Sequence, residues 1–180
     1  MNICVFGAGS IGCYVGGRLA EAGAKIAFIG RDRIGAELRQ HGLHLTDFLG
    51  ADLKLEPGRF VFSSEAAVAR EADLVLVTVK SAASAEAGVA LAAVLRPGAT
   101  VVSFQNGLRN ADVLRAVMPG HRVLAGMVEF NVISRGKGLF HQGSEGSLDA
   151  QQDPALDPYA PLFAAAGLPL TQHADFASVQ

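Results

Sequence analysis

Six consecutive residues near the N-terminus have the spacing of a phosphate-binding turn. They are Gly7, Ala8, Gly9, Ser10, Ile11 and Gly12. This run fits the pattern G-x-G-x-x-G between a predicted strand and a predicted helix, in which the glycines permit a tight turn, a close approach of pyrophosphate to the backbone, and close helix packing. Free N–H groups and the positive end of the helix dipole attract the phosphate charge. The run therefore predicts a dinucleotide site, although glycine-rich turns also occur for structural reasons alone.

The residue after the second predicted strand indicates which nucleotide binds. In an NAD site, an Asp or Glu about twenty residues after the glycines binds the 2′-hydroxyl of the ribose. Here the position holds Arg31, whose planar guanidinium can bind a 2′-phosphate through two hydrogen bonds and stack on adenine. Arg31 therefore favours NADP(H) over NAD(H). The alternative is a solvated turn in which Arg31 pairs with its neighbour Asp32.

Polar residues directly follow two buried strands farther along the chain. Lys80 comes directly after the run LVLVTV, and Gln105 and Asn106 follow the run ATVVSF. Both positions fall at carboxyl ends of strands, the edge of a doubly wound sheet at which ligands bind. A lysine there can hold a phosphate, a ribose hydroxyl or a carbonyl oxygen, and the Asn106 amide can donate and accept toward a nicotinamide or a substrate carbonyl. Each residue also has an ordinary alternative, a solvated lysine or an Asn-Gly turn.

The elements that must position these residues alternate between strand and helix. Apolar runs predict buried strands at 2–6, 25–29, 74–79 and 99–104. Helical spacing predicts helices at 11–22, 82–95 and 111–118, the last capped by Asn110. Residues 43–62 predict a short strand excursion. This order indicates the α/β class, with a doubly wound, Rossmann-like and mostly parallel sheet.

The pattern changes after Gly120. Residues 122–134 and 138–148 are strand-like runs joined by a turn at Gly136, which predicts an antiparallel hairpin added to the sheet near its C-terminal end. A predicted helix at 159–166 and a predicted strand at 168–172 follow. We therefore expect one NADP-binding, Rossmann-like domain over residues 1–172.

Composition excludes several classes of function. The chain has 180 residues, is 50% hydrophobic and 18% charged, and carries a net charge of −2, which excludes a disordered chain and argues against a nucleic-acid partner. Apolar stretches are short and no basic-then-apolar leader opens the chain, so we expect a cytoplasmic protein with no membrane partner. Cys4 and Cys13 lie in predicted core elements, which suits a reduced compartment. The five histidines lack the spacing of metal ligands, so no metal is predicted.

The motifs and their order resemble the ketopantoate reductase (2-dehydropantoate 2-reductase) family. The resemblance rests on GAGSIG, Arg31, ADLVLVTVKS around Lys80, SFQNGLRN around Asn106, and the later run RVLAGMVEFNVISRGKGLFHQGSEG. It implies reduction of ketopantoate, a small 2-oxo acid, to pantoate by NADPH, a step toward pantothenate and coenzyme A.

The resemblance also implies a role for each matched residue. Gly7 to Gly12 would hold the pyrophosphate, Arg31 the 2′-phosphate and Lys80 the nicotinamide-ribose side. Asn106 would meet both cofactor and substrate, and Val132 would make a backbone contact to NADPH. The segment EFNVIS at 129–134 departs from the threonine- and alanine-rich version common in the family.

Members of that family continue past the position of Gln180 into an all-helical second domain that supplies a lysine acting as general acid. The resemblance thus implies that residues 173–180 begin such a domain, that no catalytic residue lies in this chain, and that the chain binds NADPH with little or no turnover. Two alternatives stay open: a related reductase of another 2-oxo acid or an imine, and a regulatory module that binds NADP(H) without catalysis. Surface left uncovered without the second domain predicts self-association, with a homodimer as one form.

Overall fold

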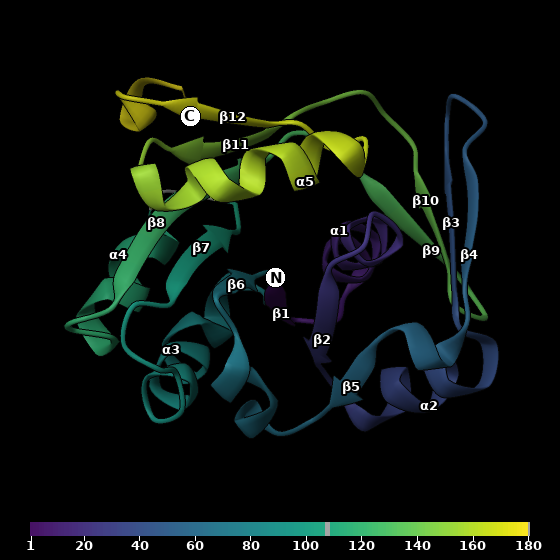
Figure 1. The fold of residues 1–180 in the computed structure, drawn as a ribbon, viewed down its shortest axis with the longest axis horizontal. Helices are drawn as coiled ribbons and strands as arrows, with labels where there is room; N and C mark the ends of the chain where they lie inside the picture. The colour runs from purple at the N-terminus through teal and green to yellow at the C-terminus, as the bar shows by residue number, and fades with distance from the viewer. Residues whose placement is uncertain (107–108, 180) are drawn as a thin grey trace.

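The chain forms two β-sheets, which the computed structural model describes over residues 1–106 and 109–179 (Figure 1). Gly107, which belongs to the Asn-Gly turn given above as an alternative, lies outside the described residues, as does Gln180. The larger sheet contains β1 (Asn2–Phe6), β2 (Lys25–Ile29), β5 (Val61–Ser63), β6 (Leu74–Val77), β7 (Thr100–Phe104), β8 (Arg122–Val128), β11 (Leu148–Gln151) and β12 (Leu170–His173). The smaller sheet contains β3 (Leu43–Asp47), β4 (Asp52–Leu55), β9 (Val132–Gly136) and β10 (Leu139–Gln142).

The larger sheet has the strand order of a doubly wound fold. The order is β12-β11-β8-β7-β6-β1-β2-β5, and every neighbouring pair from β5 to β8 is parallel. Val5 of β1 lies between Phe28 of β2 and Leu76 of β6. The strands β2 and β5 thus lie on one side of β1, and the later strands β6, β7 and β8 lie on the other side. The predicted α/β class with a mostly parallel, Rossmann-like sheet is confirmed.

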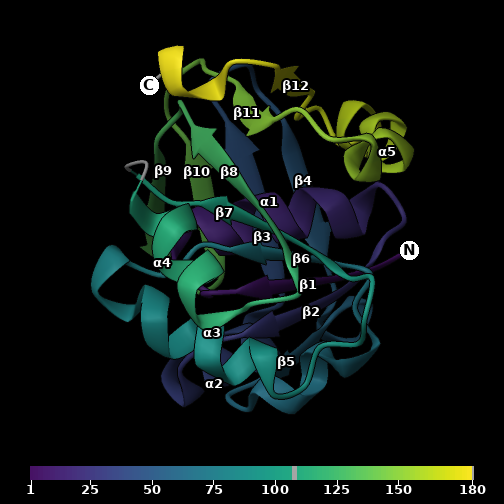
Figure 2. The same ribbon diagram turned by 90° about the vertical axis from the view of Figure 1, so that its left-hand side faces the viewer.

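Helices cover both faces of the larger sheet. The α-helices are α1 (Ser10–Glu21), α2 (Asp32–His41), α3 (Ser84–Ala92), α4 (Arg109–Val117) and α5 (Ala160–Ala165). Short 3₁₀ turns are η1 (Pro57–Arg59), η2 (Ala66–Glu71), η3 (Ser81–Ala83), η4 (Pro154–Tyr159) and η5 (Phe176–Ser178). Figure 1 shows α1 between the two sheets, and Figure 2 shows α3 and α4 in front of the larger sheet. Buried apolar side chains therefore form one cluster on the α1 face and another on the α3 and α4 face.

Glycines let α1 fit closely between the sheets. A Cβ on Gly16 would lie 2.5 Å from the Phe28 ring in the larger sheet, and one on Gly17 would lie 2.7 Å from Leu45 in the smaller sheet. The smaller sheet is also held to α1 by Tyr14, whose buried hydroxyl donates to Gln142 Oε1 at 2.8 Å. The orientation of α1, and of the turn before it, is thus determined by packing on two sides.

The predicted antiparallel hairpin with a turn at Gly136 is present, but it pairs elsewhere. β9 and β10 are antiparallel to each other and belong to the smaller sheet, where β10 runs parallel to β3. The predicted strand 122–134 is two strands, because the chain leaves the larger sheet at 129–131 after β8. The antiparallel addition to the larger sheet is β11, which pairs with β8.

Other expectations differ from the structure in detail. The excursion at 43–62 is confirmed as β3 and β4, whereas the helix α2 was not anticipated. The prediction that Asn110 caps a helix is wrong, because Asn110 lies inside α4. Its side chain is instead buried and bonded to Ser84 and to the Asn106 carbonyl.

Candidate functional site

The glycine-rich turn and Lys80 follow β1 and β6, the two neighbouring strands at which the strand order of the larger sheet reverses. A doubly wound sheet opens a crevice at this point. Arg31 follows β2 and Asn106 follows β7, whereas Val132 lies in β9 of the smaller sheet. Thr78, the first residue after β6, donates from Oγ1 to the Gly7 carbonyl at 2.7 Å and from its backbone N–H to the Phe6 carbonyl at 2.9 Å. These bonds hold the glycine-rich turn against the end of β6.

The three motif glycines differ in their surroundings. A Cβ on Gly7 would lie 2.6 Å from the Val79 nitrogen, and the backbone φ of Gly7 is +123°. A Cβ on Gly12 would overlap the Gly7 carbonyl oxygen. Beyond its chain neighbours, Gly9 has no described atom within 4 Å of the position that a Cβ would take. Packing therefore requires Gly7 and Gly12, whereas the open side of Gly9 leaves space for a ligand against the backbone.

The open side of Gly9 adjoins the N-terminus of α1. Gly9 is the N-cap residue, and its carbonyl accepts the first helical bond from the Cys13 N–H at 2.9 Å. The N–H groups of a first helical turn lack partners within the helix, and no Asp or Glu lies in this turn. Unpaired donors and a positive dipole end beside an open backbone fit a pyrophosphate.

Arg31 lies beside the same turn. A Cβ on Gly30 would lie 2.5 Å from the Ala8 Cβ, so the residue before Arg31 is packed against the glycine-rich turn. Arg31 is exposed and caps α2, with its carbonyl accepting from the backbone N–H groups of Ile34 and Gly35. In the described part of the chain it forms no ion pair, so the predicted alternative pairing with Asp32 is absent. Its guanidinium is therefore available to a phosphate.

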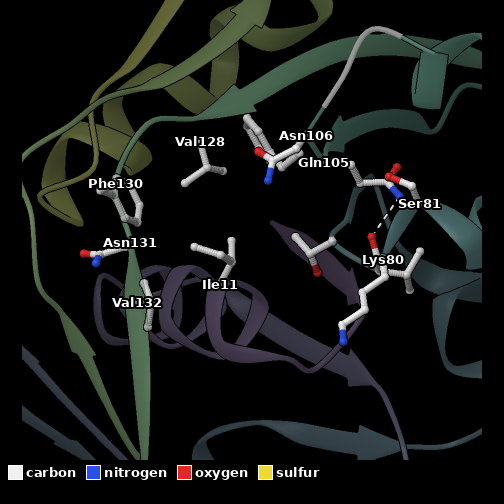
Figure 3. Close-up of a pocket in the computed structure, with 12 residues that line it drawn as sticks. Ile11, Lys80, Ser81, Gln105, Asn106, Val128, Phe130, Asn131 and Val132 are labelled. Carbon is white, nitrogen blue, oxygen red and sulfur yellow. Dashed lines mark hydrogen bonds between the residues drawn. The ribbon is translucent and has the colours of Figure 1, made fainter.

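A pocket of about 520 Å³ brings together four of the other predicted residues, Ile11, Lys80, Asn106 and Val132. Lys80 and Asn106 lie on one side of it at the ends of β6 and β7, and the Asn106 amide points into the pocket (Figure 3). The apolar side chains of Ile11, Val128 and Val132 lie on the opposite side. One wall can therefore donate hydrogen bonds to a polar group while the other packs against an apolar ring.

The pocket also contains residues that the sequence did not single out as site residues. They are Thr78, Val79, Ser81, Phe104, Val128, Phe130 and Asn131. Thr78 could have been found from its place at the end of the run LVLVTV. Asn131 lies between β8 and β9, and only the exit of the chain from the larger sheet brings it to the pocket.

The described part of the chain shows no reactive thiol, no metal-binding cluster and no membrane-spanning helix. Burial raises the pKa of the Cys4 thiol to about 12 and that of Cys13 further still, with Glu37 adding to the latter. Neither thiol is therefore a thiolate near neutral pH. Within the described residues no group of three or more His, Cys, Asp or Glu side chains could hold a metal ion, and no helix is long and apolar enough to cross a membrane.

Comparison with known proteins identifies the family to which the chain belongs. The sequence model of the family "Ketopantoate reductase PanE/ApbA" matches residues 3–154, which include every predicted cofactor-binding residue. The chain belongs to the ketopantoate reductase PanE/ApbA family. This match confirms the predicted resemblance. The members of the family are pyridine-nucleotide-dependent oxidoreductases.

Individual ketopantoate reductases match over most of this chain. The 2-dehydropantoate 2-reductase of Halobacterium salinarum is 35% identical over 127 residues, 70% of this chain and 41% of that protein. The enzyme of the same name from Pyrococcus abyssi is 27% identical over 81% of this chain and 46% of its own length. The crystal structure of a PanE/ApbA family ketopantoate reductase from Ralstonia eutropha superimposes with a TM-score of 0.88 at 33% identity, covering 97% of this chain and 57% of that one. The chain thus spans about half the length of these relatives.

Proposed function

We propose that this chain is the NADP(H)-binding part of a reductase of small 2-oxo acids, with 2-dehydropantoate as substrate. The observation that carries the proposal is the open backbone at Gly9, beside the α1 N-terminus and at the same crevice as the pocket of Lys80 and Asn106. The matched ketopantoate reductases bear the names of enzymes with this activity.

In this proposal each part of the dinucleotide has its own residues. Gly7 to Gly12 bind the pyrophosphate, and Arg31 binds the 2′-phosphate that distinguishes NADP(H) from NAD(H). Lys80 binds the nicotinamide-ribose side, Asn106 binds both the nicotinamide and the substrate, and Val132 contributes a backbone contact. When bound, the cofactor supplies the hydride that reduces the substrate carbonyl.

The residues of the chain orient the reacting groups and exclude water. In this proposal the apolar wall of Ile11, Val128 and Val132 packs against the bound nicotinamide and substrate from one side. The Asn106 amide donates from the other side toward a carbonyl oxygen. Residues 1–172 are proposed as the cofactor-binding domain and residues 173–180 as the start of a helical domain. A lysine of that helical domain, beyond Gln180, is the proposed general acid.

A second candidate substrate follows from the composition of the wall. Val128, Phe130 and Val132, in and beside EFNVIS, make this wall more apolar than a threonine- and alanine-rich segment would. This favours a 2-oxo acid whose side chain is more apolar than that of ketopantoate. A panel of 2-oxo acids, reduced by the complete enzyme, separates the two candidates by their kcat/KM values.

Titration of NADPH and NADH into the purified chain, followed by nicotinamide fluorescence, tests the proposal. We expect tighter binding of NADPH, and we expect Arg31→Ala to remove the preference, a loss of about 1–3 kcal/mol for a charge-assisted contact. Arg33→Ala, which removes an exposed arginine two residues away, is the control for net charge and should retain the preference. A folded chain that binds neither nucleotide would refute the proposal. Sedimentation velocity of the same sample tests the predicted homodimer.

A further inference from the structure

Gln105 links the end of β7 to the loop that carries Lys80. Its Nε2 donates to the Val79 carbonyl, which belongs to the peptide group before Lys80, and to Ser84 Oγ, both at 2.8 Å (Figure 3 draws the first bond). Its Oε1 accepts from Ser103 Oγ at 2.8 Å. Both N–H donors of Gln105 are thus used within the protein, which separates its role from that of the neighbouring Asn106.

Ser84 extends this connection back to Asn106. Its hydroxyl donates to Asn110 Oδ1 at 3.0 Å, and Asn110 Nδ2 donates to the Asn106 carbonyl at 2.5 Å. Because Gln105 and Asn106 are consecutive, the bonds through Gln105, Ser84 and Asn110 close a ring. Ser84, Gln105 and Asn110 are buried residues, each at most 5% exposed.

The ring permits only one arrangement of its protons. The Val79 and Asn106 carbonyls can only accept, so the amide nitrogens of Gln105 and Asn110 must face them. Asn110 Oδ1 is then an acceptor for the Ser84 hydroxyl, and Ser84 Oγ in turn accepts from Gln105. A shift of the loop that carries Lys80, or of the loop that carries Asn106, would therefore leave a buried donor or acceptor without its partner. The loss of a buried hydrogen bond costs more free energy than the loss of an exposed one.

We propose that this ring positions Lys80 and Asn106 for the nicotinamide half of the cofactor, with Gln105 and Ser84 as positioning residues. The inference rests on the proposed function, which assigns Lys80 and Asn106 to that half. A fully bonded polar network in the core costs little and specifies one geometry, whereas an apolar core would let the two loops shift independently. Arg31 follows β2, on the other side of β1 from β6 and β7, so the ring does not determine its position.

The test separates the two halves of the cofactor. NADPH and 2′,5′-ADP, which carries the adenosine and the 2′-phosphate but no nicotinamide, are titrated calorimetrically into the wild-type chain and three variants. Ser84→Ala opens the ring, and Gln105→Met removes both donors at similar volume. Ser103→Ala is the matched control, because it also deletes a buried hydroxyl that bonds Gln105 but lies on a branch outside the ring. Thermal unfolding of each variant shows whether it is folded.

We expect Ser84→Ala and Gln105→Met to weaken NADPH binding about tenfold while 2′,5′-ADP binding stays within about twofold. Ser103→Ala should leave both affinities within about twofold. Equal weakening of both ligands, or no more weakening in the ring variants than in Ser103→Ala, overturns the inference, since the ring would then be only structural. A wild-type chain that binds neither ligand instead refutes the proposed function, and the inference with it.

Discussion

The contrast between Gly9 and Gly12 predicts opposite effects from the same substitution. Gly12→Ala gains about 1 kcal/mol of helix propensity. Its Cβ, however, overlaps the Gly7 carbonyl oxygen, a backbone atom that cannot rotate away, so the overpacking cost lies at the upper end of about 1–3 kcal/mol. The net loss is about 2 kcal/mol, which corresponds to a decrease in Tm of about 4–8 °C for a domain of this size.

Gly9→Ala should leave the stability of the fold unchanged. The backbone φ of Gly9 is −83°, which alanine adopts readily, and no described atom lies within 4 Å of the new Cβ beyond the chain neighbours. Alanine is a poorer N-cap residue than glycine, but it also lowers the conformational entropy of the unfolded chain. These two effects are opposite in sign and similar in size, so we expect a change of less than about 0.5 kcal/mol in the free energy of unfolding. Because the methyl group would occupy the space proposed for the pyrophosphate, the affinity for NADPH should fall at least about tenfold.

Thermal unfolding and fluorescence titration with NADPH, on the same samples, provide both measurements. Gly58→Ala is the matched control, because Gly58 also has open space around its Cβ position and lies in η1, outside the pocket. It should alter neither Tm nor affinity. Wild-type affinity in Gly9→Ala would show that no ligand contacts that backbone, and wild-type Tm in Gly12→Ala would refute the packing argument.

Three further predictions concern the rest of the chain. Because burial raises the pKa values of the Cys4 and Cys13 thiols, a thiol reagent at pH 8 should label them only at the rate at which the chain unfolds, and fast labelling of native protein would contradict this. The backbone N–H of Ala155 lowers the pKa of Asp153, so this carboxylate stabilises the fold above its unfolded pKa of about 3.9 and the stabilisation disappears as pH falls through the lower folded value. In urea unfolding, Asp153→Ala should therefore lower the free energy of unfolding by about 1 kcal/mol at pH 7 and by less at pH 3. An equal loss at both pH values would show that the ionised carboxylate of Asp153 does not stabilise the N-terminus of η4. Tyr14→Phe leaves Gln142 Oε1 without its donor and should cost about 1–3 kcal/mol by the same measurement, and a cost near zero would show that the bond does not anchor the smaller sheet.

The sequence alone predicted the parts of the site that depend on local order. A strand, a glycine-rich turn and a helix in succession specify the phosphate-binding turn, because each of them depends on residues close in the chain. Lys80 and Asn106 were predicted together because parallel strands bring their carboxyl ends to one edge. The same logic placed Arg31 beside the turn, although only the structure shows that Arg31 is not paired with Asp32.

Only the tertiary structure decided which distant segments meet. The pairing of β10 with β3 joins residues almost a hundred positions apart, and alternation of apolar and polar residues reports a buried face but not the partner strand. The apolar wall near Val132 depends on that pairing. The ring through Gln105, Ser84 and Asn110 likewise depends on side chains from three segments. Such hydrogen bonds are specified by distances and angles between elements, which sequence spacing does not contain.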